Sequence, residues 1–186
     1  TEIYTLSLHD ALPISIVVAS QVVGALQTIV ARNIDPIDSA VVTVGQFNAG
    51  TARNVISGSA QLSGTVRYFN PKYADFFSER FERIIGGLCA AHNAEYCLNY
   101  WRLYPATVND PRMADLVRSV AEQVIETPLG VVPECQTMGG EDMSFFLNEV
   151  PGCYFFVGAA NADRDLAYPH HRSEEHTSEL QSLTNL

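Results

Sequence analysis

The fold is decided by residues 60–88, which read AQLSGTVRYFNPKYADFFSERFERIIGGL. In its first ten residues apolar and polar side chains alternate, which is typical of a half-buried strand, and Arg67 falls on the polar face. Asn70 and Pro71 then supply a helix N-cap and a proline in the first turn. The apolar residues that follow recur at helical spacing to about His92. The segment therefore predicts a strand followed directly by an amphipathic helix.

Three further elements flank this pair. The spacing of apolar residues predicts a helix over 16–32, a β-branched strand over 40–48 and an aromatic-rich strand over 95–103. The order helix, strand, strand, helix, strand is one leading strand short of a βαββαβ unit, in which both helices cover one face of the sheet. We therefore expect a two-layer, ferredoxin-like α+β domain over residues 15–105 that lacks its first strand.

The pattern changes after residue 105. A helix is expected from Asp110-Pro111, a short helix near 142–148, and a strand over 153–159 (CYFFVGA), which is apolar on both faces like a strand inside an α/β sheet. Two helices and one such strand cannot bury their own apolar surfaces. Residues 106–171 are therefore expected to be the C-terminal part of a larger, incomplete α/β domain.

The two ends of the chain have an unusual composition. Residues 1–14 (TEIYTLSLHDALPI) look like the translation of a sequencing adapter, and residues 172–182 (RSEEHTSELQS) look like the adapter of the opposite side. We therefore expect residues 1–14 and 172–186 to be adapter-derived artefacts and exclude them from the fold prediction. His9 and His176 would then carry no chemistry.

Composition limits the possible partners. The chain has 186 residues, 47% of them hydrophobic, and a formal net charge of -10, which disfavours nucleic acid and anionic membranes as partners. No apolar run reaches the roughly 18 residues that a membrane span needs. Four cysteines lack C-x-x-C spacing and lie in apolar surroundings, so we expect buried, reduced thiols and a cytoplasmic protein, with a disulfide or a catalytic thiol as the alternatives. They are Cys89, Cys97, Cys135 and Cys153.

Residues 50–57 (GTARNVIS) and 62–67 (LSGTVR) carry a family resemblance. They resemble the satellite domain of the aminoacylase and hippurate hydrolase group of dinuclear metallohydrolases, in which G-T-x-x-N-V-I-P precedes a strand ending in arginine. Ser57 stands where the family has proline, which predicts a less rigid turn. The resemblance implies that Asn54 and Arg67 bind the substrate carboxylate or the developing oxyanion, often in the neighbouring subunit's active site, and that the satellite domain forms a homodimer. Without it, an asparagine capping a turn and an arginine on a solvated sheet face would be the simpler interpretation.

Residues 138–146 (MGGEDMSFF) and 151–161 (PGCYFFVGAAN) carry a second resemblance to the same group. Gly139 and Gly140 would let backbone amides approach a bound substrate closely. The Glu-Asp pair that follows is expected to stabilise the start of the short helix, and a catalytic carboxylate pair is the alternative.

The resemblance also implies a metal ligand near the end of the genuine sequence. The last metal ligand of the family is a histidine at the place of His170 and His171, and His171 matches better. The full-length enzyme would hold two divalent ions, zinc or similar, of which this chain supplies one ligand.

We therefore expect a fragment of a metal-dependent amidohydrolase that cleaves the amide bond of N-acyl amino acids or similar small substrates. With the other metal ligands upstream, the fragment alone should be inactive. The alternative is a non-catalytic dimerisation or small-anion-binding module, because satellite domains of this kind have many uses.

Overall fold

The chain folds into two compact units. The computed structural model describes residues 1–10, 14–125, 130–132, 135–158 and 182–185. The first unit, called the sheet unit below, comprises Thr1–Ala106 and Met138–Gly140, and the second comprises Thr107–Thr137 and Glu141–Leu186.

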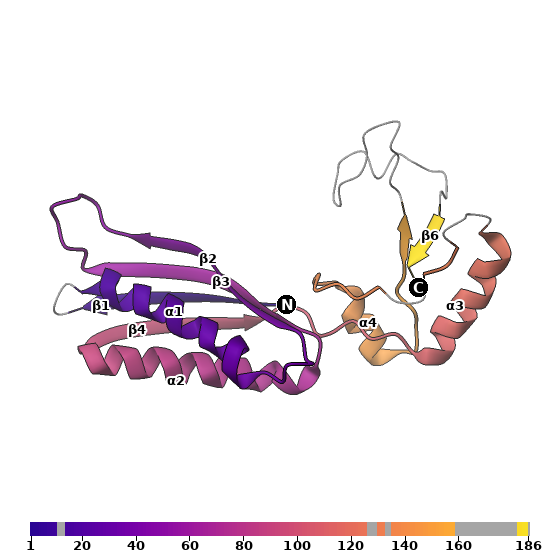
Figure 1. Ribbon diagram of the computed structural model, residues 1–186, viewed down its shortest axis with the longest axis horizontal. Coiled ribbons are helices and arrows are strands. Elements are labelled where there is room, and N and C mark those ends of the chain that lie inside the picture. The colour runs from indigo at the N-terminus through magenta and orange to yellow at the C-terminus, as the bar shows by residue number, and fades with distance from the viewer. Residues whose placement is uncertain (11–13, 126–129, 133–134, 159–181, 186) are drawn as a thin grey trace. The chain divides into compact units, whose positions relative to one another are not determined.

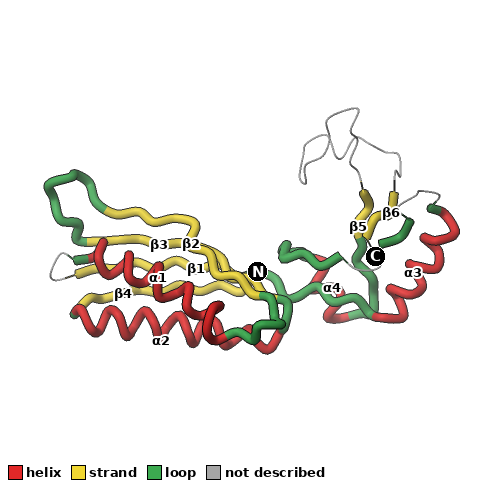
Figure 2. Tube along the Cα trace, in the orientation of Figure 1, coloured by secondary structure: helices red, strands yellow, loops and turns green. Residues whose placement is uncertain are grey.

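The sheet unit has two layers, a four-stranded antiparallel sheet and two helices that pack on one of its faces (Figures 1 and 2). The strand order is β2-β3-β1-β4. This confirms the predicted two-layer α+β architecture. The elements are β1 (Glu2–Asp10), α1 (Ser15–Asn33), β2 (Ala40–Ala49), β3 (Ser59–Tyr68), the 3-10 turn η1 (Pro71–Tyr73), α2 (Ala74–His92) and β4 (Ala94–Arg102).

The strand that we expected to be missing is present. β1 lies between β3 and β4 and pairs with both (Figure 1). Residues 2–10, which the fold prediction left out, form this strand, and the adapter origin of residues 1–14 stays a prediction. The physical reason is that this segment alternates polar and apolar residues with the period of a strand. Its apolar members Tyr4, Leu6 and Leu8 are fully buried.

The core lies between the sheet and the two helices. Each element contributes one apolar face, as the alternation and the helical spacing predict. Tyr4 meets Phe81 of α2 edge-to-face with ring centroids 4.6 Å apart, and Tyr68 stacks on Phe77 at 5.6 Å. None of the helices described in this unit covers the other face of the sheet. Fully buried side chains include Val18, Val22, Leu26, Ile29, Leu62, Val66 and Ile85.

Gly64 of β3 lies directly beneath a side chain of β1. Gly64 is the register partner of Tyr4, and the Tyr4 side chain lies over it. The Tyr4 hydroxyl donates a 3.0 Å hydrogen bond to the carbonyl oxygen of Thr43. A Cβ atom at position 64 would overlap that carbonyl oxygen and lie 2.6 Å from the Tyr4 hydroxyl. Only glycine fits here.

The buried Tyr4 hydroxyl predicts a loss of stability at alkaline pH. Burial raises the pKa of Tyr4 to about 12. In the unfolded chain tyrosine ionises near a pKa of about 10. Between these two values the unfolded state loses a proton that the folded state keeps, so the free energy of unfolding falls as the pH rises. Urea unfolding at pH 9, 10 and 11 should show a shallower fall for Tyr4→Phe than for the parent chain. Equal slopes would contradict this role of Tyr4.

The helix α1 is the one described helix that is long and apolar enough, by length and composition, to cross a membrane. This corrects the expectation that no apolar run is long enough. Val18, Val22, Leu26 and Ile29 are fully buried against the sheet. Such one-sided burial is typical of a core helix.

The cysteines differ from one another in exposure. All four are free, but only Cys89 is buried, whereas Cys153 is half-buried and both Cys97 and Cys135 are exposed. The expectation of four buried thiols is therefore wrong for Cys97 and Cys135. Cys97 is exposed because side chains alternate along β4 and its neighbour Leu98 packs against the core.

The second unit contains α3 (Pro111–Val124), α4 (Met143–Glu149), β5 (Phe156–Gly158) and β6 (Ser182–Asn185). Both helices were predicted from sequence. The expected strand over 153–159 is shorter, since only β5 is extended and its Val157 is 42% exposed. β5 pairs with β6, which lies in the part of the chain that the fold prediction left out. Within the described residues β5 pairs with β6 alone.

Candidate substrate-binding site

Arg67 lies near the end of β3, on the sheet face opposite the helices. Its position follows from the alternation of β3, because its neighbour Val66 faces the core and is fully buried. The guanidinium Nη1 donates a 2.7 Å hydrogen bond to the carbonyl oxygen of Met138. This bond joins the end of β3 to the segment Met138–Gly140, which belongs to the same unit.

Gly140 is packed too closely for any side chain. A Cβ atom there would lie 2.8 Å from Cδ2 of Tyr104 and 3.0 Å from Oγ1 of Thr1. The close approach explains why this position needs glycine. The structure thus brings together three of the five residues that the sequence singled out, namely Arg67, Gly139 and Gly140.

The charge of Arg67 is not neutralised within the described residues. The salt bridges found there involve other cations, such as Arg102, which pairs with Asp75 at 2.5 Å. Guanidinium has five N–H donors in a planar fork, and the structure shows one of them bound to Met138. The remaining donors are suited to a carboxylate or another planar anion.

Asn54 lies at the opposite end of β3. It is exposed in the turn that connects β2 to β3. Eight residue steps of extended chain separate Ser59, where β3 begins, from Arg67, which corresponds to about 26 Å. The two residues therefore do not converge within one chain. The loop does not fold back along the sheet because both strands that it joins are fully extended up to the turn.

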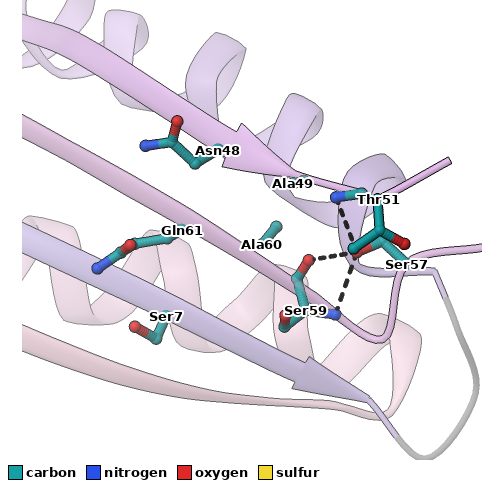
Figure 3. Close-up of a pocket in the computed structure, with 9 residues that line it drawn as sticks. Ser7, Asn48, Ala49, Thr51, Ser57, Ser59, Ala60 and Gln61 are labelled. Carbon is teal, nitrogen blue, oxygen red and sulfur yellow. Dashed lines mark hydrogen bonds between the residues drawn. The ribbon is translucent and has the colours of Figure 1, made fainter.

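Ser57 stabilises the turn that carries Asn54. Its hydroxyl oxygen accepts hydrogen bonds from the backbone N–H groups of Gly50 (3.1 Å) and Ser59 (3.4 Å), and it donates to the carbonyl oxygen of Ser59 at 2.6 Å (Figure 3). The expected loss of rigidity from the missing proline is therefore offset by three hydrogen bonds.

A polar pocket lies beside this turn, on the uncovered face of the sheet (Figure 3). Its volume is about 390 Å³. Asn48, Gln61 and Ser7 form one row across β2, β3 and β1, because Gln61 is the register partner of both others. Sequence reasoning missed this row, since the register between strands distant in sequence cannot be inferred from their patterns. Amide and hydroxyl groups dominate the pocket, and none of its described lining residues is charged.

The Glu-Asp pair lies at the start of α4, as expected. Asp142 is the N-cap residue of α4, but its side chain makes no capping hydrogen bond. The Ser144 hydroxyl instead donates to the carbonyl oxygen of Glu141 at 2.6 Å. Burial and a hydrogen bond with Glu141 raise the pKa of Tyr154.

The described residues do not form a metal centre. Within the ranges that the structure describes, no group of three or more His, Cys, Asp or Glu side chains converges. His171, the predicted ligand, and the alternative His170 lie outside the described residues. The described residues therefore do not supply the ligands that a dinuclear metal site needs.

Comparison with known proteins extends these observations. Residues 10–185 match the family described as Peptidase family M20/M25/M40. N-acetyldiaminopimelate deacetylase of Lacticaseibacillus casei is 38% identical over 164 residues, which cover 85% of this chain and 42% of that protein. The enzyme of the same name from Priestia megaterium is 36% identical over 143 residues, covering 77% of this chain and 38% of that protein.

Solved structures agree with the sequence match. A Staphylococcus aureus protein superposes with a TM-score of 0.75 at 27% identity and covers 91% of this chain and 46% of its own. Bacillus subtilis YXEP, described as a dinuclear metal binding peptidase from the M20 family, superposes with a TM-score of 0.65 at 25% identity. That match covers 81% of this chain and 38% of YXEP.

The chain spans less than half the length of the curated relatives that it matches. The family match nevertheless extends over nearly all of it, through both compact units. The two segments that suggested a metallohydrolase of the aminoacylase group lie inside the matched residues. This chain belongs to the peptidase family M20/M25/M40.

Proposed function

We propose that the chain is part of an amidohydrolase that cleaves the amide bond of N-acyl amino acids or similar small substrates. Family membership supports hydrolysis of an amide bond, and two relatives are named as deacetylases of an N-acetylated amino acid. The observation that carries the substrate class is Arg67, a cation without an acidic partner in the described residues that sits against the Met138–Gly140 segment.

Arg67 would bind the carboxylate that every N-acyl amino acid carries. A charge-assisted hydrogen bond of this kind contributes about 1.5–3 kcal/mol. Its bond to Met138 limits the rotamers of the side chain and so lowers the entropic cost of binding. Gly139 and Gly140 would present backbone amides to the substrate, although the side of Gly140 where a Cβ atom would stand is covered by Tyr104 and Thr1.

Asn54 and Arg67 would act at one site only if they come from two copies of the chain. The length of β3 separates them by about 26 Å, which exceeds the span of a small N-acyl amino acid. A homodimer formed through the sheet unit, with the Asn54 turn of one copy reaching the Arg67 site of the other, would bring them together. A two-fold axis would create two equivalent sites.

Catalysis would need parts that the described residues lack. We infer that the whole enzyme holds two divalent metal ions, zinc or similar, because YXEP is described as dinuclear. His171 would supply one ligand. Since one ligand cannot hold a catalytic ion, the chain alone would be inactive. Cytoplasmic localisation, suggested by free thiols, belongs to the same proposal.

The proposal is tested by Arg67→Ala in the full-length enzyme. With an N-acyl amino acid as substrate, kcat/KM should fall about 10- to 100-fold, because the variant loses a charge-assisted bond. With the corresponding N-acyl amino acid amide, which has no carboxylate, the same substitution should have a much smaller effect.

Arg83→Ala is the matched control, because Arg83 is exposed on α2 in the other layer of the sheet unit. It should change kcat/KM less than about twofold, as surface substitutions usually do. An equal loss with both substrates, or no loss for Arg67→Ala, would show that Arg67 does not bind the carboxylate.

A further inference from the structure

Trp101 of β4 stands on the same face of the sheet as Arg67. Its neighbour Tyr100 packs against the core, so Trp101 points to the side that none of the described helices of this unit covers. Ile3 of β1 is the register partner of both Trp101 and Thr65. Because Thr65 lies two residues before Arg67 on β3, it shares a face with Arg67. The three strands therefore present Trp101 and Arg67 to one side.

The two side chains are close enough for a small substrate to contact both. Two strand spacings across the sheet and two residue steps along it correspond to about 12 Å between their Cα atoms. Gly140 packs against Thr1 and Tyr104, which lie beside the end of β4. Because Met138 lies two residues from Gly140, the bond that Arg67 donates to it directs the guanidinium toward β4.

The end of β4 presents apolar surface next to this cation. Trp101 is 48% exposed, and Leu103, two residues further along the chain, is 38% exposed. Tryptophan side chains are highly buried on average, and exposed ones are enriched where proteins bind other molecules. A cation beside an apolar surface is suited to a ligand that carries a carboxylate next to an apolar group.

The apolar surface would meet the amino-acid side chain of the substrate rather than its acyl group. In an N-acyl amino acid a single carbon atom joins the carboxylate to the side chain, whereas the acyl group lies beyond the scissile amide. In the proposed enzyme that amide is polarised at a metal centre, and within the described residues no group of metal ligands converges near Arg67. The surroundings of Arg67 therefore face the amino-acid half of the substrate.

We propose that Trp101, together with Leu103, selects substrates whose amino-acid side chain is large and apolar. This inference rests on the proposed function, because it requires Arg67 to bind the carboxylate. An aromatic or branched aliphatic side chain would lie against the indole ring and release water from both surfaces. A glycine substrate would gain nothing there, and a charged side chain would lose part of its hydration.

The inference is tested with this chain alone, because Trp101 is its only tryptophan. Tryptophan emission therefore reports on this one side chain. N-acetylphenylalanine should shift the emission to shorter wavelength and protect it from quenching by acrylamide, because the bound ligand excludes water from the indole. N-acetylglycine has the same carboxylate and acyl group, and in competition with N-acetylphenylalanine it should bind about 10-fold more weakly.

The Arg67→Ala variant separates the failure of this inference from the failure of the proposed function. It should bind N-acetylphenylalanine about 10-fold more weakly than the parent chain. If both ligands bind equally well and both depend on Arg67, the carboxylate site stands and the preference for apolar side chains is wrong. If binding does not depend on Arg67, the carboxylate role is contradicted and the inference falls with it. Unchanged emission with N-acetylphenylalanine would also overturn the inference.

Kinetics of the full-length enzyme give a second readout. Trp101→Ala should raise the KM for N-acetylphenylalanine about 10-fold and leave kcat nearly unchanged, because the contact is equally strong in the ground and transition states. The KM for N-acetylglycine should change less than about twofold. Trp101→Phe should keep most of the preference, and Ile37→Ala, at an apolar residue that is 90% exposed, should keep all of it. Equal losses with both substrates would show that Trp101 has only a structural role.

Discussion

Replacing Gly64 with alanine is expected to lower the free energy of unfolding of the sheet unit by about 3 kcal/mol or more. The added methyl group would overlap the carbonyl oxygen of Thr43 and lie 2.8 Å from Cζ of Tyr4. Neither neighbour can move away easily, because Thr43 belongs to the paired backbone of β2 and Tyr4 is fully buried. The strain therefore falls on the centre of the sheet.

Gly45→Ala is the matched control for this prediction. Gly45 also lies in a strand, but a Cβ atom there would meet only the carbonyl oxygen of Ser63, at 3.9 Å. Its free energy of unfolding should change by less than about 0.5 kcal/mol. Urea titrations followed by circular dichroism compare the two variants with the parent chain. Similar midpoints for both variants would mean that Tyr4 does not pack over Gly64 as described.

Local patterns predicted the helices and strands of the sheet unit closely. The helix expected to follow Asn70-Pro71 is preceded by η1, where the Asn70 side chain accepts a hydrogen bond from the N–H of Lys72. α2 then ends at His92, as its apolar stripe indicated. These features are set by residues three or four positions apart, so sequence alone contains the information.

Features that depend on distant pairing could not be predicted. Residues 2–10 are a different case, because their alternation is local and typical of a strand. They were left out of the prediction because they look like a sequencing adapter, but a segment can form a strand whatever the origin of its residues. The contact between Arg67 and Met138 joins positions 71 residues apart, and no local pattern encodes it. The pocket residues likewise meet only through the register of three strands.

The separation of Asn54 from Arg67 leads to the second large expected effect. If each catalytic site takes Arg67 from one chain and Asn54 from the other, full-length Arg67→Ala and Asn54→Ala variants should each lose about 10- to 100-fold in kcat/KM. A mixed dimer of the two would contain one site with both residues intact and one site with neither. Random assortment gives half mixed dimers, so about a quarter of the parent activity should return.

The most direct test of the account is therefore activity after the two full-length variants are unfolded together, refolded and assayed against each variant refolded alone. Recovery of about a quarter of the parent kcat/KM would support a site shared by two chains. If the mixture is no more active than the separate variants, the two residues do not meet across an interface, and the proposed shared site is contradicted.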